Sequence, residues 1–93
     1  MSENSKIQLL PGFVIKVREA PDLSTALDIE VALQRPDMSV VQRRAHPVGG
    51  SRLELGLHVE DLALEGEYAG EVSCMLGGEK KVYSPAFTLR VSG

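Results

Sequence analysis

Tryptophan is absent from this chain of 93 residues, cysteine occurs once, and the aromatic side chains are limited to two Tyr and two Phe. A single cysteine excludes an internal disulfide. The stability of so small a domain must then come from packing, which suits a reducing cytosol. The scarcity of aromatic rings argues against a carbohydrate-binding module, because such modules usually present exposed rings to the sugar.

Long apolar runs and an excess of positive charge are also missing. No stretch approaches the roughly 20 apolar residues of a membrane-spanning helix, so no membrane partner is expected. Residues 1–6, "MSENSK", lack the apolar core of a secretory signal and are predicted to be a polar N-terminal tail. The net charge of −3 argues against nucleic acid as a partner, since nucleic-acid binding normally needs a basic face. The one basic cluster, Arg43-Arg44, is interpreted as a solvated strand end.

What the chain does contain is alternation of apolar and polar residues, in five segments. Such a period of two indicates half-buried strands, because successive side chains of a strand point to opposite faces. The members expected to face the core are Phe13, Ile15 and Val17; Leu27, Ile29, Val31 and Leu33; Leu53, Leu55, Leu57 and Val59; Tyr68, Gly70, Val72, Cys74 and Leu76; and Phe87, Leu89 and Val91.

One of these segments has a helical alternative. Residues 22–34, "DLSTALDIEVALQ", place several apolar residues near helical spacing, with Ser24 as a possible cap. A helix would leave Ile29 and Leu33 poorly placed, so the strand interpretation is favoured. Two weaker strand candidates are residues 38–45, with Met38 and Val40, and the short segment 6–10.

Turn residues separate the alternating runs at positions 21–22, 35–37 and 47–50. Gly77-Gly78 between two runs predicts a tight hairpin, since both glycines can take a positive φ. Pro85 lies inside the last run and lacks a backbone donor, so it predicts an edge strand or a bulge that re-aims Ala86 and Phe87. Six or seven short strands without a convincing helix predict one all-β domain over residues 1–93, a β-sandwich or small barrel.

The stretch "LEGEYAGEVSC", residues 64–74, resembles the entry into strand F of immunoglobulin-like and fibronectin type III-like sandwiches. There a tyrosine corner forms, in which the tyrosine hydroxyl bonds back to the upstream backbone. Tyr68 matches the corner residue. Antibody-type domains have a cysteine two residues after that tyrosine, whereas Cys74 lies six residues on, and the partner cysteine and core tryptophan are missing. The chain is therefore not a strict antibody-type domain.

The last thirty residues are also similar to immunoglobulin-like modules of tailed-bacteriophage virion proteins. The shared positions are Gly66, Tyr68, Gly70, Val72, Gly77-Gly78, Ser84, Phe87, Leu89 and Val91. The resemblance implies an immunoglobulin-like antiparallel β-sandwich of about seven strands. It also implies a non-enzymatic component of a capsid decoration, tail or baseplate, located in the virion and assembled in the host cytoplasm. The alternative is a binding module excised from a larger bacterial surface or adhesion protein, located at the cell surface.

No catalytic constellation is recognisable. His46 and His58 have no second ligand at a metal-binding spacing, and a calcium site from Glu60, Asp61 and Glu65 is a weak alternative to a solvated acidic loop. Gly49-Gly50-Ser51 is rich in glycine, but no Walker-type lysine or helix follows it, so it is interpreted as a loop. No cofactor, metal or small-molecule ligand is expected, and a small hydrolase lacks an acid or His beside a nucleophile.

Cys74 shares a face with Tyr68, Val72 and Leu76, so we expect it to be core filling rather than a reactive thiol. The candidate partner-binding residues are Tyr83, Ser84 and Pro85, because Pro85 indicates an edge where a partner strand could add. Tyr83 is expected to be partly exposed. The expected partners are other virion proteins or copies of the chain itself.

Overall fold

The computed structural model describes residues 12–92, so the tail at 1–6 and the candidate strand at 6–10 lie outside the described residues. The described chain is all-β, with one short 3-10 helix, and it contains no helix of the length and apolarity needed to cross a membrane. The strands are β1 (Phe13–Lys16), β2 (Leu27–Gln34), β3 (Val40–Gly49), β4 (Arg52–Leu55), β5 (Gly66–Leu76) and β6 (Glu79–Val91), and the helix η1 (Val59–Leu62) lies between β4 and β5.

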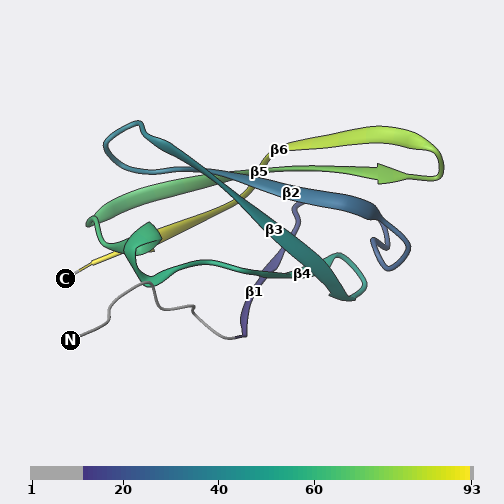
Figure 1. Cartoon of the computed structure of the whole chain (residues 1–93), viewed down its shortest axis with the longest axis horizontal. Coiled ribbons are helices and arrows are strands. Elements are labelled where there is room, and N and C mark those ends of the chain that lie inside the picture. The colour runs from purple at the N-terminus through teal and green to yellow at the C-terminus, as the bar shows by residue number, and fades with distance from the viewer. Residues whose placement is uncertain (1–11, 93) are drawn as a thin grey trace, which may run out of the picture.

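The six strands form one antiparallel sheet in the order β1-β4-β3-β2-β5-β6. The strand that curls this sheet is β3. Its first half, Val40–Arg44, pairs with β2, and its second half, from Ala45 to Gly49, pairs with β4. In Figure 1, β3 crosses diagonally between the part of the sheet with β2, β5 and β6 and the part with β1 and β4.

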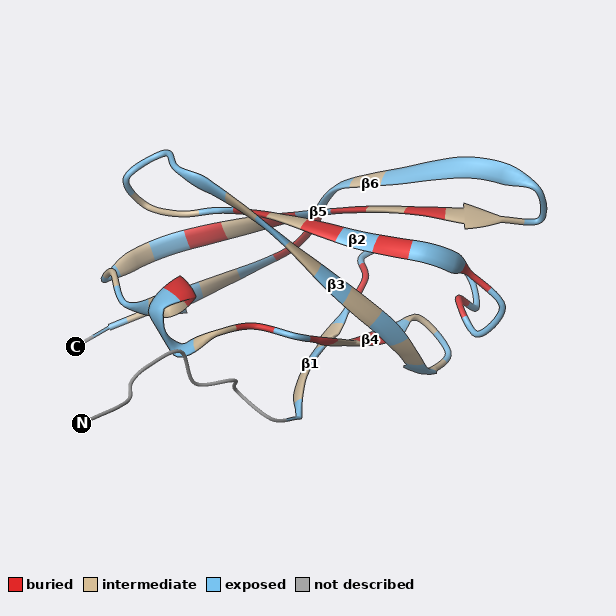
Figure 2. Ribbon diagram, in the orientation of Figure 1, coloured by how far each residue is buried: buried red, intermediate tan, exposed pale blue. Residues whose placement is uncertain are grey.

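The core lies inside the curl, where inward side chains from nearly every strand meet. Figure 2 shows the resulting alternation as buried bands along β2 and β5. The large apolar residues alternate along the strands, so they all lie on one side of the sheet. That side is the concave one, because only there are these side chains removed from water. The buried apolar residues are Val17, Leu23, Ala26, Ile29, Val31, Leu33, Leu53, Leu55, Leu57, Tyr68, Val72, Cys74, Ala86 and Phe87.

Residues 27–34 form a strand, which confirms the favoured interpretation over the helix. The predicted inward position of Leu27 is wrong, because its side chain is 67% exposed. The register with β5 shifts between Leu27 and Glu30, and Asp28 has φ 53°. This bulge turns the first residue of β2 to the outside, while Ile29, Val31 and Leu33 stay in the core.

The strand β3 is longer than the sequence indicates, and its inward-facing residues are the odd-numbered ones rather than the predicted even-numbered ones. It includes Pro47, which was predicted to begin a turn, so that only Gly50 and Ser51 separate β3 from β4. Met38 and Val40 are exposed, and Val41, Arg43 and Ala45 are half-buried instead. Positions 38 and 40 thus belong to the outer face. The apolar content of this segment was too low to determine its face.

The predicted strand over residues 53–60 ends at Leu55, and Val59 begins η1 with its side chain exposed rather than buried. Asp61 in η1 is buried, which corrects the interpretation of the acidic stretch as wholly solvated. Its carboxylate accepts two hydrogen bonds of 2.8 Å from Arg43 and one of 2.9 Å from the His58 N–H. Arg43 is therefore no solvated strand end, although its neighbour Arg44 is exposed.

Tyr68 forms the hydrogen bonds of the predicted corner. Its hydroxyl donates to the Leu64 carbonyl oxygen at 2.7 Å and accepts from the Leu64 N–H at 3.1 Å. The ring is 1% exposed, so these bonds satisfy the one polar atom of a buried side chain. The corner joins the loop after η1 to the start of β5.

Candidate functional site

The free edge of β6 is the feature of the described chain best suited to contact a partner. β6 lies at one end of the sheet, and it pairs with β5 on its other side. Gly77 and Gly78 have φ 61° and 81°, which confirms the predicted hairpin, and a type I′ turn requires this pair of values. The half of β6 next to this turn is exposed along most of its length (Figure 2).

A bulge interrupts β6 where the sequence predicts one. Gly70 of β5 pairs with Phe87, and Val72 pairs with Tyr83, so that one residue of β5 opposes the three residues 84–86 of β6. The Ser84–Pro85 peptide bond is cis. Because of the extra residues, the side chains of both Ala86 and Phe87 point into the core, which confirms the predicted change in their direction.

The three candidate contact residues lie together on this bulge. Tyr83 is half-buried and packs against the core, while Ser84 and Pro85 are exposed. Val82, which is not among the residues predicted from the sequence to bind a partner, lies beside them and is 52% exposed. The partial exposure expected for Tyr83 is confirmed; the role of the three residues in binding stays a prediction.

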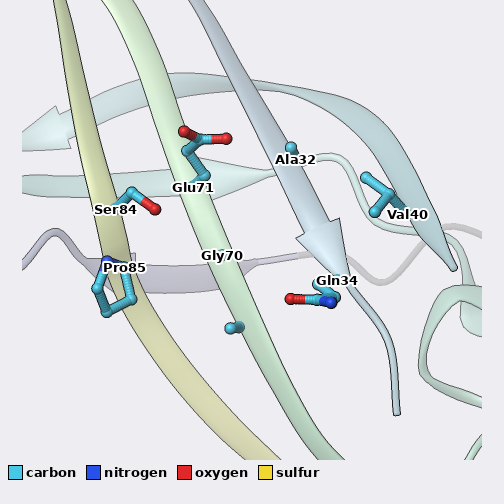
Figure 3. A pocket seen from close by; sticks show the side chains of 8 residues that line it. Ala32, Gln34, Val40, Gly70, Glu71, Ser84 and Pro85 are labelled. Atoms are coloured by element: carbon cyan, nitrogen blue, oxygen red, sulfur yellow. The ribbon is translucent and has the colours of Figure 1, made fainter. Parts of the chain in front are cut away.

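A hollow of about 290 Å³ lies on the outer face of the sheet beside the bulge. Figure 3 shows Ser84 and Pro85 of β6 bordering it on one side and Val40 of β3 on the other. The small side chains of Ala32 on β2 and Ala69 on β5 leave the space open, Gly70 adds to the lining, and the polar groups at the rim are Gln34, Glu71 and Ser84. The related signal in the sequence is alanine at positions 32 and 69, and it becomes informative only when the pairing of β2 with β5 is known.

A second hollow, of about 400 Å³, lies on the edge side of the same bulge. It is lined by residues 82–85 together with Arg18 and Glu19, which follow β1. The Arg18 N–H donates to the Ala86 carbonyl oxygen at 2.8 Å, so the segment after β1 covers the edge of β6 at this point only. Between residues 79 and 85 no backbone hydrogen bond to another described segment beyond β5 is found. Ser84 and Pro85 thus line both hollows.

The edge of β6 carries two lysines in an otherwise acidic protein. Lys81 forms an ion pair with Glu79 at 3.0 Å, and this hydrogen-bonded carboxylate raises the pKa of Lys81. Both groups are exposed, so the pair adds little to stability. Lysine and proline on an edge hinder uncontrolled strand pairing.

The other residues considered from the sequence do not come together into a reaction centre. His46 contacts Glu54 at 3.2 Å. His58 precedes η1, and its backbone exchanges two hydrogen bonds with Asp61: the His58 N–H donates to the carboxylate, and the His58 carbonyl oxygen accepts from the Asp61 N–H. Residues 12–92 contain no group of three His, Cys, Asp or Glu side chains placed to share a metal ion. Cys74 is buried as predicted, and its burial raises the pKa of the thiol, which disfavours the reactive thiolate.

Comparisons with protein-family models, with curated proteins and with solved structures found no match to this chain.

Proposed function

We propose that this chain is a non-enzymatic structural or interaction module that binds other proteins through the edge of β6 and the bulge at residues 83–85. The observation that carries the proposal is the exposed half of β6, which lies at the end of the described sheet with Val82 uncovered and a hollow on either side of the bulge. An extended partner segment that adds to β6 would gain backbone hydrogen bonds, and the hollows would accept its side chains.

The finer architecture that we propose is an immunoglobulin-like sandwich of about seven strands. In this arrangement β1 and β4 belong to one layer, β2, β5 and β6 belong to the other, and β3 passes between them. Two features support it, namely the split pairing of β3 and the corner hydrogen bonds of Tyr68 to Leu64. An experimental structure with two face-to-face layers would establish it, and an open barrel would overturn it.

The setting that we propose is the virion of a tailed bacteriophage, where the module acts as a capsid decoration, tail or baseplate protein assembled in the host cytoplasm. It rests on the resemblance of the last thirty residues. Repeated copies in such a particle would let weak single contacts add up. The alternative is a binding module of a larger bacterial adhesion protein at the cell surface. A mass-spectrometric inventory of purified particles and of surface fractions from the source separates the two.

Site-specific photocross-linking tests the contact surface itself. A photoreactive phenylalanine analogue replaces Val82 on the β6 edge, and in a control it replaces Val14, which is 46% exposed on β1 at the other end of the sheet. The protein is expressed in the cells or particles of its source and irradiated. We expect a discrete adduct from position 82 that is lost when Tyr83 and Ser84 are changed to Ala and Asp, and no such adduct from position 14.

Two results would count against the proposal. Equal cross-linking from positions 82 and 14 would mean that β6 is no preferred contact edge. A catalytic turnover that disappears on changing a single polar residue would replace the interaction module with an enzyme.

A further inference from the structure

The turn between β3 and β4 contains the glycine-rich motif Gly49-Gly50-Ser51, for which the sequence predicts nothing more than a loop. Gly49, Gly50 and Ser51 lack a lysine that follows them along the chain, but Lys16 reaches the same place from β1. The antiparallel pairing of β1 with β4 sets Lys16 directly opposite Arg52, and Arg52 also pairs with Gly49. These five residues line one hollow of about 570 Å³.

Among the described residues, no carboxylate forms an ion pair with either of the two cations in this hollow. Opposed like charges on a sheet are unfavourable. The nearest carboxylate on β4, Glu54, is occupied by His46 on one oxygen and by the Gly12 N–H on the other. Asp22 lies near the turn, because the N–H of the next residue, Leu23, donates to the Gly50 carbonyl oxygen. Its carboxylate accepts hydrogen bonds from the backbone N–H and the hydroxyl of Ser24.

The backbone of the turn adds donors to this positive charge. In the described part of the chain, neither the Gly50 N–H nor the Ser51 N–H donates to a protein group. Gly49 and Gly50 have φ 123° and 58°, values that keep the turn free of side chains. A Cβ atom at Gly49 would lie 3.5 Å from a terminal nitrogen of Arg52, so the guanidinium lies over the turn.

We propose that Lys16, Arg52 and the Gly49–Ser51 turn bind a small tetrahedral oxyanion, a phosphate or sulfate group, taken up either as the free ion or as an ester. The Arg52 guanidinium would donate hydrogen bonds to two of its oxygens, and the Lys16 ammonium and the N–H groups of the turn would donate to the others. An anion placed there would also remove the repulsion between the two cations. The site shares no residue with the two hollows beside the β6 bulge, so its test is independent of the proposed function.

The experiment is a titration of ¹⁵N-labelled protein at pH 7 and constant ionic strength, followed by amide chemical shifts. The probes are inorganic phosphate, inorganic sulfate and glycerol phosphate. We expect saturable shifts confined to residues 16 and 49–52. Lys16→Gln and Arg52→Gln should each weaken binding about tenfold or more, the effect of losing one charge-assisted hydrogen bond. Lys80→Gln, which removes an exposed lysine on β6, should bind as the unaltered protein does.

Binding of the inorganic ions alone assigns the site to free oxyanions, and binding of glycerol phosphate as well assigns it to esters. Thermal unfolding adds a second readout and shows that the variants fold. Without anion, Lys16→Gln should unfold at the same temperature as the unaltered protein or higher. Phosphate should raise the unfolding temperatures of the unaltered protein and of Lys80→Gln more than that of Lys16→Gln. Chemical shifts that change linearly with anion concentration would overturn the proposal, and so would Lys16→Gln binding phosphate as tightly as the unaltered protein.

Discussion

At the scale of single residues, Gly70 of β5 provides space for the side chain of Phe87 on β6. The ring of Phe87 lies over it, in the space that a Cβ atom at position 70 would occupy. The missing side chain thus lets Phe87 enter the core beside Ala86. Glycine is required here for close packing and not for an unusual φ.

We therefore expect Gly70→Ala to destabilise the fold by about 2–3 kcal/mol, because the added methyl group overpacks a site that cannot widen without moving the bulge. Urea unfolding followed by circular dichroism measures the change. Gly56→Ala is the matched control, since its Cβ atom would make an ordinary contact of 3.6 Å with the Arg44 carbonyl oxygen. The control should be neutral or stabilising by up to about 1 kcal/mol. Equal losses in both variants would contradict the packing explanation.

Asp61 is the buried charge on which the turn after β4 depends. Burial would raise the pKa of this carboxyl, but the hydrogen bonds from Arg43 and the His58 N–H and the charge of Arg43 outweigh it and lower the pKa. The contribution of Asp61 to stability is therefore complete above its unfolded pKa of about 3.9 and disappears as the pH falls through the lower folded value.

Asp61→Asn should cost about 3 kcal/mol at pH 7, because Arg43 loses its charged partner in a half-buried place. The difference in unfolding free energy between the unaltered protein and this variant should shrink as the pH falls from about 5 to about 2. Urea titrations at several pH values test both statements. Arg44→Gln, at the exposed neighbouring position, should change stability by no more than about 0.5 kcal/mol. A difference that stays constant with pH would show that Asp61 does not titrate as described.

At the scale of elements, the β5–β6 hairpin is specified by its own short stretch of sequence. Alternation in both arms fixes the inward face, and Gly77-Gly78 fixes the turn. The hairpin and the bulge at Pro85 were therefore predictable, because both depend on local backbone chemistry. The hollow beside them was not, since it needs β2 and β5 side by side.

Gly77→Asn should preserve the hairpin, because Asn-Gly is a favoured type I′ turn. Gly77→Val should destabilise the protein by about 1–2 kcal/mol, since a β-branched residue resists a positive φ. Thermal unfolding gives the free-energy change, and hydrogen exchange of the β6 amides shows where the protection is lost. A loss of protection spread over β1 and β4 in the Val variant, with β6 unaffected, would contradict a local turn effect.

At the scale of the whole molecule, β3 makes the two parts of the sheet into one structure. Each half of β3 is paired with a different neighbour, and the core side chains of both parts pack into one cluster. Neither part can keep its apolar face from water once the other has left. Cys74 and Tyr68 on β5 are both buried in this shared core.

We therefore expect a single cooperative unfolding transition. Urea curves from far-ultraviolet circular dichroism, tyrosine fluorescence and the reactivity of the Cys74 thiol should coincide, with the thiol inert until the protein unfolds. Cys74→Ala, followed by the first two probes, controls for effects of the thiol reagent. A thiol that reacts before the sheet is lost would show that β5 opens independently of the rest.

By itself the sequence determined the strand class, the inward faces of β1 and β5, the Gly77-Gly78 turn, the bulge at Pro85 and the burial of Cys74. Each of these depends on side-chain alternation or on backbone chemistry within a few residues. Only the tertiary structure decided that Leu27 points outward, that Arg43 joins Asp61 and that Lys16 lies opposite Arg52. Those features depend on register between strands far apart in the chain, and register is chosen by the packing of the whole core.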